Sequence, residues 1–303
     1  MAVDWDLKAL RARTRDAKRR TLHEAGSPNR EEIDLYGRFL LEAFPGRKPP
    51  LDKRVVVLGM TPALRLLAHR LGCEVVCVDN NAASIEYFRD WNPPESSETE
   101  RIVQADWLDL ARVLGGRADA ILGDGVFGNV LSVEDHQALL RVLKDSVPED
   151  GVLIFRKILI PRSFSVQENE AERLLEKFRT GGLTEAEFGF AMRIWGSFHH
   201  AYDPKTFLLD NGLVFERYET WLDEGVLSRD EHRVIERYYF AGLNLVPAQD
   251  LWESLLAEAG FRFRCEPLKG KSWYRYYPVY CCRVGQTKQA SGGAEGPSRG
   301  HTP

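Results

Sequence analysis

The chain lacks three features that would each indicate a particular class of protein: an excess of basic charge, a long apolar run and a paired set of cysteines. Its 41 Lys and Arg residues are balanced by 45 Asp and Glu residues, for a net charge of −4. Nucleic-acid-binding proteins present a basic surface, so we expect no nucleic-acid partner. No window approaches about 18 uninterrupted apolar residues, the length that a membrane-spanning helix needs, so we expect no membrane partner.

The five cysteines are an odd number, and no two of them form a C-x-x-C pair. The first 20 residues contain no apolar segment of the kind found in secretory signals. Both observations favour a reducing, cytoplasmic location. His232 and Glu236 have a spacing that occurs in metal sites, but no third ligand accompanies them, so we expect no bound metal. Nothing in the sequence indicates an oligomeric state.

The chain does have a regular alternation of apolar runs and amphipathic segments. The run RVVVLG at 54–59 is continuously apolar, which is typical of a strand buried on both faces. Repetition of this pattern predicts an α/β fold with a doubly wound, mostly parallel sheet. The expected strands are 54–59, 74–79, 101–106, 118–124 and 151–160, and the helices between them are 61–72, 81–91, 109–116 and 133–147.

Residues 1–50 precede this alternation and are expected to form N-terminal helices. The pattern predicts one helix over 4–25 and another over 29–44, where Asn29 is a suitable N-cap and Glu32 would complete a capping box. The basic residues between Arg11 and Arg20 are interpreted as a solvated helix face, because acidic residues accompany them.

The alternation stops after the fifth expected strand and resumes at residue 247. A structureless loop of that length is improbable, and the stretch 161–246 contains amphipathic, aromatic-rich helical segments, so we interpret it as a helical cap. The last two expected strands have no helix between them, which favours an antiparallel hairpin at the sheet edge. The expected C-terminal elements are a helix at 247–260, strands at 261–268 and 274–285, which complete a core of 51–160 and 247–285, and a disordered tail at 286–303.

Small and polar residues follow the ends of four expected strands. In a parallel sheet, ligands bind beyond the carboxyl ends of the strands, near the point where the strand order reverses. Gly59 permits a tight turn and close approach of a ligand to the backbone, and Thr61 suits a helix N-cap. Asp79 is placed to accept hydrogen bonds from ribose hydroxyls. The expected cofactor-binding residues are Gly59, Met60, Thr61, Asp79, Asn80, Asp106, Trp107, Asp124, Gly125 and Asn129.

These strand ends resemble those of class I S-adenosylmethionine-dependent methyltransferases, which have a Rossmann-like core, over roughly 30–160 and more faintly over 247–285. The resemblance implies S-adenosylmethionine as cofactor, with Asp79 at the ribose, and Asp106 and Trp107 at the adenine. It also implies that the segment from Asp124 to Asn129 lines the cofactor and the substrate. The first loop departs from the family's E/D-x-G-x-G-x-G pattern, because it reads Val-Leu-Gly-Met-Thr-Pro at 57–62 and has a single glycine.

The resemblance implies methyl transfer by in-line displacement, for which the protein mainly aligns donor and acceptor and excludes water. A general base is needed only if the acceptor must lose a proton. The candidates are His199, His200, Tyr202 and His136. We expect a small-molecule acceptor, because the chain is not basic and a cap covers the core.

Two alternatives remain open on the residues alone. The chain could be a non-catalytic cofactor-binding protein on the same fold. A nicotinamide-dependent oxidoreductase is less favoured, because it would need G-x-G-x-x-G after the first strand, where Met60, Thr61 and Pro62 stand. The sequence Asn-Pro-Pro-Glu at 92–95 resembles the N-P-P-aromatic motif of amino-group methyltransferases that act on nucleic acids, but it follows a helix after the second strand and is interpreted as a helix stop.

Overall fold

The computed structural model describes residues 7–18, 20–91, 100–266 and 268–285. Its centre is a seven-stranded sheet in the order β11-β12-β7-β6-β3-β4-β5. The first five strands of the chain's core pair in parallel, whereas β12 is antiparallel to both β7 and β11, which confirms the doubly wound sheet with a hairpin at its edge. The strands are β3 (Arg54–Leu58), β4 (Glu74–Asp79), β5 (Glu100–Gln104), β6 (Ala120–Asp124), β7 (Val152–Arg156), β11 (Phe261–Glu266) and β12 (Val279–Val284).

Alternate side chains of each strand enter two separate hydrophobic cores, because successive residues of a strand point to opposite faces. Val55 and Val57 of β3 pack on the helices of one face, while Val56 and Leu58 pack on those of the other. Burial of such a side chain stabilises the fold by about 1.5–3 kcal/mol. The helices of the first face are α2 (Arg30–Ala43), α3 (Pro62–Arg70) and α4 (Ala82–Phe88), and those of the second are α5 (Leu110–Leu114), α6 (Val133–Asp145) and α12 (Gln249–Glu258).

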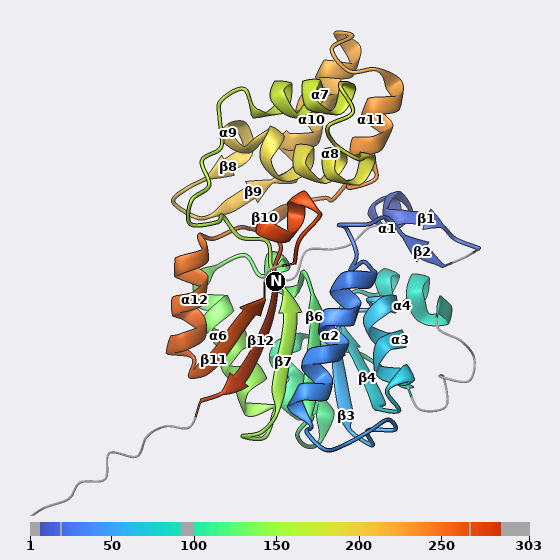
Figure 1. Ribbon diagram of the computed structural model, residues 1–303, viewed down its shortest axis with the longest axis vertical. Coiled ribbons are helices and arrows are strands. Elements are labelled where there is room, and N and C mark those ends of the chain that lie inside the picture. Colours follow the sequence, from blue (N-terminus) through green and yellow to red (C-terminus); the bar gives the residue numbers. More distant parts are fainter. Residues whose placement is uncertain (1–6, 19, 92–99, 267, 286–303) are drawn as a thin grey trace, which may run out of the picture.

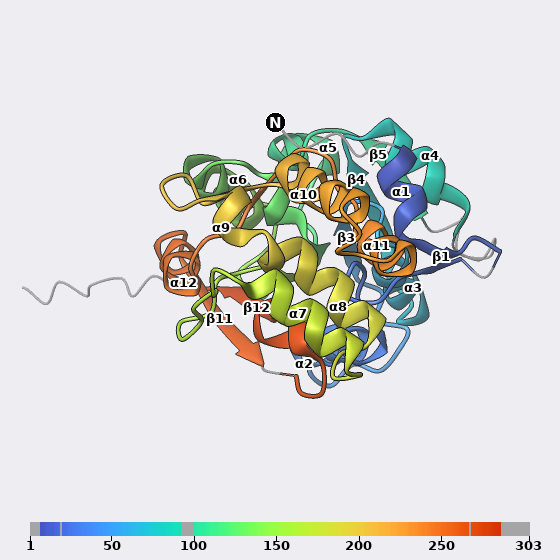
Figure 2. The same ribbon diagram turned by 90° about the horizontal axis from the view of Figure 1, so that it is seen from above.

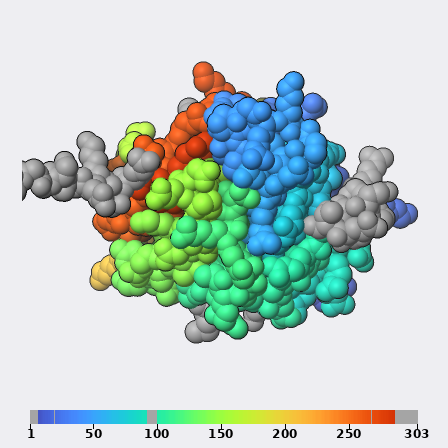
Figure 3. Space-filling model, turned by 90° about the horizontal axis from the view of Figure 1, so that it is seen from below, coloured from blue at the N-terminus to red at the C-terminus, as the bar shows by residue number. Residues whose placement is uncertain are grey.

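A cap follows β7 in the chain and lies over one end of the sheet (Figures 1 and 2). Its two ends meet, because Ile160 and Ala248 form a parallel bridge. Seen from the opposite end, the molecule shows mainly the core elements, with the cap almost hidden behind them (Figure 3). The cap contains α7 (Glu170–Arg179), α8 (Glu185–Ala191), a π-helical turn η5 (Met192–Gly196), α9 (Phe198–Ala201), α10 (Asn211–Asp223) and α11 (Arg229–Glu236), and also a small sheet of β8 (Tyr202–Asp203), β9 (Leu208–Asp210) and β10 (Leu243–Leu245).

The N-terminal segment differs from the expected pair of helices. The second helix is present as α2, and Asn29 and Glu32 form the expected capping box. The first helix, α1 (Leu7–Arg13), ends early and is followed by a hairpin of β1 (Thr14–Asp16) and β2 (Thr21–Leu22). The prediction of a helix to residue 25 is therefore wrong, because the Asp16 carboxylate accepts the amide N–H of Lys18 and this local turn competes with the helix.

Two strand boundaries also differ. The expected strand 151–160 ends at Arg156, and the expected strand 274–285 begins at Val279. Pro278 has no amide hydrogen to donate to a ladder, and the preceding residues form the turn η6 (Ser272–Arg275). The motif at 92–95 and the tail 286–303 lie outside the described residues. Within the described part of the chain, no helix combines the length and the apolar character that crossing a membrane requires.

Candidate functional site

A cavity, which we call the switch-point cavity, lies where the order of the parallel strands reverses around β3. Residues at the ends of β3, β4 and β6 line its floor, among them Gly59, Asp79 and Asp124. Leu10, Arg13, Leu22, Gly26 and Ser27 of the N-terminal segment line its other side. This is the position at which α/β sheets bind their ligands.

The end of β3 forms part of the cavity wall. Gly59 has a φ of +84°, which side-chain-bearing residues rarely adopt. Met60 and Thr61 also line the cavity. Thr61 precedes α3, with Pro62 at the first helical position, but its hydroxyl makes no capping hydrogen bond. Thr61 thus occupies the expected N-cap position, but its side chain lies on the cavity wall and does not cap the helix.

Asp79, at the end of β4, is the main carboxylate on the floor of this cavity. Its side chain is only 7% exposed, and Oδ1 accepts the amide N–H of Asn81 at 2.9 Å. Burial raises the pKa of Asp79 above its ordinary value, against the hydrogen bonds that it accepts from neighbouring groups. Further hydrogen-bond donors, such as the hydroxyls of a ribose, would stabilise the charged form of this buried carboxylate. Asn80 lies beside it on the same wall.

Trp107 provides a flat apolar wall, and Asp106 directly precedes it in the sequence. The Trp107 indole N–H donates to the Val78 carbonyl at 2.8 Å, which fixes the ring beside β4. Asp106 accepts the amide N–H of Leu108 as a cap and lines a smaller adjoining pocket that also includes Asn80 and Trp107. The structure thus brings Trp107 into the switch-point cavity and places Asp106 at its margin.

A second cavity lies between the core and the cap, and we call it the cap cavity. It shares Arg13, Gly26, Asp124 and Asn129 with the switch-point cavity, so the two spaces adjoin. The predicted residue Gly125 lies on its wall. Its walls include aromatic and apolar side chains from the cap, from the segment after β7 and from the segment after η6. These are Ile158, Phe190, Phe240, Leu245, Val246 and Tyr277.

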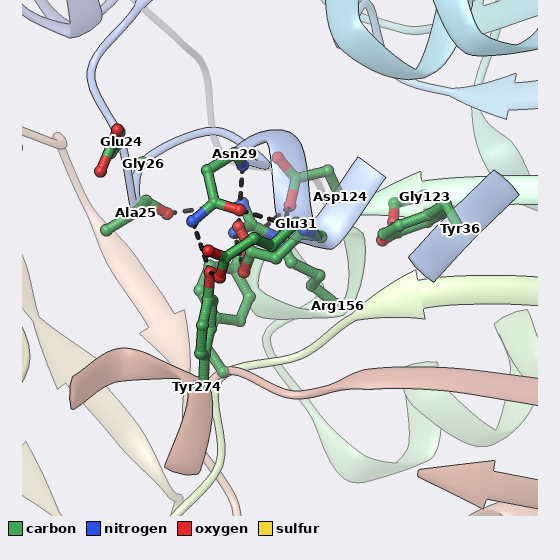
Figure 4. A network of polar contacts seen from close by, with 12 residues as sticks. Glu24, Ala25, Gly26, Asn29, Glu31, Tyr36, Gly123, Asp124, Arg156 and Tyr274 are labelled. Atoms are coloured by element: carbon green, nitrogen blue, oxygen red, sulfur yellow. Dashed lines mark hydrogen bonds and ion pairs between the residues drawn. The ribbon is translucent and has the colours of Figure 1, made fainter. Parts of the chain in front are cut away.

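Arg156 contacts both the N-terminal segment and Asp124, which lies at the junction of the two cavities (Figure 4). Its guanidinium donates to Asp124 Oδ1 and to Glu32 Oε1, each at 2.7 Å, and to the Ala25 carbonyl at 3.4 Å. Burial opposes its charge, but the Asp124 and Glu32 carboxylates hold the pKa of Arg156 well above its ordinary value. Tyr277 donates its hydroxyl to the same Asp124 oxygen at 3.2 Å and lies under the Arg156 guanidinium.

Two further arginines reach the cap cavity, and the sequence analysis identified neither. Arg13, which was expected on a solvated helix face, is partly buried instead and donates to the Gly26 carbonyl. Arg11, Arg15, Lys18 and Arg20 are exposed as expected, so the interpretation fails at Arg13, where α1 ends and the side chain lines both cavities. Arg193 lies on η5 and is 3% exposed. A single arginine inside the apolar stretch 188–195 was the available signal for it.

The expected general bases lie elsewhere. His199 and His200 are exposed on α9, and His199 contacts the Val166 carbonyl. Tyr202 donates its hydroxyl to the Val246 carbonyl and stacks on Phe198. Among the described residues, none of these three side chains lines the switch-point or the cap cavity. We therefore assign no catalytic role to them.

Two other buried side chains, one of them a candidate general base, have structural roles. His136 is fully buried against the Phe127 carbonyl, and burial, with a smaller effect of Lys157, lowers its pKa to about 3. Tyr36, on α2, is also fully buried and donates to the Gly123 carbonyl at 2.7 Å (Figure 4). His232 lies 3.6 Å from Glu236, but the described residues contain no group of three side chains placed to hold a metal ion.

No family model and no curated protein sequence matches the chain. Its fold is similar to that of solved structures at low sequence identity. CcbJ methyltransferase from Streptomyces caelestis matches with a TM-score of 0.53 and 12% identity, over 86% of this chain and 92% of that one. The glycopeptide N-methyltransferase MtfA has a TM-score of 0.49 and 14% identity, over 85% of this chain and 91% of that one.

A Rhodobacter sphaeroides protein described as a Zn-dependent alcohol dehydrogenase also has a TM-score of 0.49, with 15% identity over 86% of this chain and 91% of that one. Of these three likenesses, only the one to CcbJ exceeds a TM-score of 0.5. It extends over most of both chains and agrees with the resemblance seen at the strand ends. The chain has the fold of class I S-adenosylmethionine-dependent methyltransferases.

Proposed function

We propose that the chain is a methyltransferase that binds S-adenosylmethionine in the switch-point cavity and a small-molecule acceptor in the cap cavity. The observation that carries this proposal is that the two cavities adjoin, with Arg13, Gly26, Asp124 and Asn129 on both. A donor site and an acceptor site must meet for a group to pass between them. The apolar walls of the cap cavity and the net charge of −4 favour a small molecule over a nucleic acid.

The residues of the switch-point cavity fit this cofactor. The buried Asp79 carboxylate can accept hydrogen bonds from ribose hydroxyls, and the Trp107 ring can cover a base. Gly59 leaves the backbone open to close approach, since a Cβ built on it would lie 3.8 Å from Asp79 Oδ2 and would enter the cavity wall. When bound, S-adenosylmethionine supplies a methyl group already activated on a sulfonium.

The chain itself then has to orient the acceptor and exclude water. The aromatic walls of the cap cavity serve the second task, because they replace solvent around the reacting groups. Asp124 lies at the junction of the cavities, where it already accepts hydrogen bonds from Arg156 and Tyr277. We therefore assign to Asp124 an orienting role at the junction rather than the role of a general base.

Isothermal titration of the full chain with S-adenosylhomocysteine, S-adenosylmethionine and NAD tests the proposal. We expect a micromolar dissociation constant for S-adenosylhomocysteine, equivalent to about −8 kcal/mol, and no saturable binding of NAD. Binding of NAD alone would favour an oxidoreductase. Tight binding of S-adenosylhomocysteine without methyl transfer to any member of an acceptor library would favour a non-catalytic cofactor-binding protein.

A further inference from the structure

Arg193 is a buried cation whose described neighbours leave its charge without a counterion. It is 3% exposed and lines the cap cavity. Its Nε donates to Asn211 Oδ1 at 3.0 Å, and its Nη2 donates to Asn244 Oδ1. Both partners are neutral amides, and no carboxylate of the described residues forms an ion pair with it. A buried charge without a counterion is costly, so this arrangement favours a ligand that supplies one.

The two amides hold the Arg193 side chain in place. The Asn211 amide nitrogen donates to the Gly242 carbonyl at 2.8 Å, and the Asn244 amide nitrogen donates to the Gly128 carbonyl at 3.1 Å. These bonds turn both amide oxygens toward the guanidinium. The Phe240 ring lies 4.9 Å from the Arg193 guanidinium carbon and 5.9 Å from that of Arg13. The cation is therefore fixed in position before any ligand arrives.

The carboxylates near the cap cavity are already paired with a different arginine. Glu32 and Asp124 each form an ion pair with Arg156, at 2.7 Å, and neither of them forms one with Arg193. Burial, and secondly the nearby Arg13, lower the pKa of Arg193 to about 9. Arg193 therefore has a positive charge that no carboxylate of the described residues pairs, and one monoanionic group would match it.

From this geometry we propose that the methyl acceptor carries a carboxylate, and that Arg193 binds this group in the cap cavity. A carboxylate has a single charge and the planar shape that a guanidinium binds through two hydrogen bonds. The aromatic walls formed by Phe190, Phe240 and Tyr277 suit a flat apolar body attached to it. This inference rests on the proposed function, because it names the substrate class of the same site.

Arg193 distinguishes the acceptor from the cofactor, whose methionine end also has a carboxylate. Arg13 lines both cavities, so it can serve either ligand. Arg193 lines the cap cavity and is absent from the wall of the switch-point cavity. A change at Arg193 should therefore weaken an acidic acceptor and leave the affinity for S-adenosylhomocysteine intact.

The test uses simple probes on the full chain, each titrated with and without S-adenosylhomocysteine. The probes are benzoate and phenylacetate, their uncharged amides benzamide and phenylacetamide, and phenyl phosphate as a dianion. We expect the better carboxylate to bind at least about tenfold more tightly than its amide, because only the carboxylate pairs with the guanidinium. Equal binding of acid and amide, no binding of either acid at millimolar concentration, or tighter binding of phenyl phosphate would each overturn the proposal.

Two variants locate the binding in the cap cavity. Arg193→Gln removes the charge, and Asn211→Asp supplies an internal carboxylate next to Arg193. Asn211 is the first residue of α10, where a negative charge is favourable. The change also removes the hydrogen bond that the Asn211 amide donates to the Gly242 carbonyl, so retained affinity for S-adenosylhomocysteine must show that this variant is folded. Both changes should lower the affinity for the carboxylate probe at least about tenfold. The matched control is Arg217→Gln, which removes another cap arginine that contacts the Gly196 carbonyl and lines neither cavity.

The readouts separate this proposal from the proposed function. A carboxylate that binds equally to Arg193→Gln and to the unchanged chain contradicts the role of Arg193, even if S-adenosylhomocysteine binds as expected. The converse result has two parts: the unchanged chain does not bind S-adenosylhomocysteine, and both variants bind benzoate more weakly than the unchanged chain does. This result supports the anion site and contradicts only the methyltransferase assignment. Retained affinity for S-adenosylhomocysteine in a variant also shows that the variant is folded.

Discussion

Replacement of Gly59 by Ala tests whether the cofactor approaches the backbone at the end of β3. Gly59 has a φ of +84°, and an L-residue in the left-handed region costs about 1–2 kcal/mol. The new Cβ would meet only Asp79 Oδ2, at an ordinary contact distance of 3.8 Å, so no clash adds to that cost. The methyl group would nevertheless stand on the cavity wall. We expect the affinity for S-adenosylhomocysteine to fall at least about tenfold, or about 1.4 kcal/mol.

Gly115 provides the matched control for this experiment. Its φ is +62°, and a Cβ built there would meet nothing within 4 Å. Gly115→Ala should therefore lose a similar about 1–2 kcal/mol of unfolding free energy in urea, but keep the full affinity for S-adenosylhomocysteine in calorimetry. If Gly59→Ala and Gly115→Ala bind the ligand equally well, the cofactor does not approach Gly59 and the reasoning is refuted.

Three further predictions concern single side chains. Asp79→Asn should weaken S-adenosylhomocysteine by about 1–3 kcal/mol in calorimetry, because the ribose loses a charged acceptor, and an unchanged dissociation constant would remove Asp79 from the site. His136 has a folded-state pKa of about 3, below its unfolded value, so its stabilising effect is complete above about pH 6.5 and is lost as the pH falls toward 3. The unfolding free energy of the unchanged chain should thus drop by about 2 kcal/mol more than that of His136→Gln between pH 7.5 and 5, and equal drops would contradict this assignment. Tyr36→Phe should lower the unfolding free energy by about 1–3 kcal/mol, since the Gly123 carbonyl loses its donor, while S-adenosylhomocysteine binds normally; a weaker affinity would show that Tyr36 acts on the cavity.

The strand ends of the core were predictable from the sequence because local patterns determine them. The continuous apolar run of β3 indicates burial on both faces, and Gly59 marks the turn that follows it. The acidic residues Asp79 and Asp124 close β4 and β6 as expected. In a parallel sheet these ends converge at one edge whatever the intervening helices do, so the positions of the strand-end residues on the floor of the switch-point cavity followed from sequence order.

The cap cavity was not predictable in the same way. Its walls combine Arg13, Arg193, Phe240 and Tyr277, which are distant in sequence and meet only through tertiary packing. No periodicity links such residues. The adjacent histidines of α9 were more conspicuous in the sequence, but the packing of α9 leaves them exposed. A lone arginine in an apolar stretch, as at Arg193, is a weaker signal and here is the more informative one.

Glu32 shows how one residue can hide a second role. In the sequence it completes the capping box of Asn29, and the structure confirms that role. The same carboxylate also receives a hydrogen bond from Arg156, which is more than a hundred residues away. The local sequence explains why α2 begins near Glu32. Only the fold shows that Arg156 connects this helix start to Asp124, at the junction of the cavities.

The pairing of β7 with β12 has a consequence for how the chain reaches its folded state. The two strands are separated by the whole cap and by α12, so a long loop must close before they meet. During synthesis, β7 therefore emerges with one edge open, and its sequence VLIFR is apolar and prone to pair with another chain. Truncation before Val279 should leave that edge exposed permanently and produce aggregates, whereas the full-length chain covers it with its own last strand.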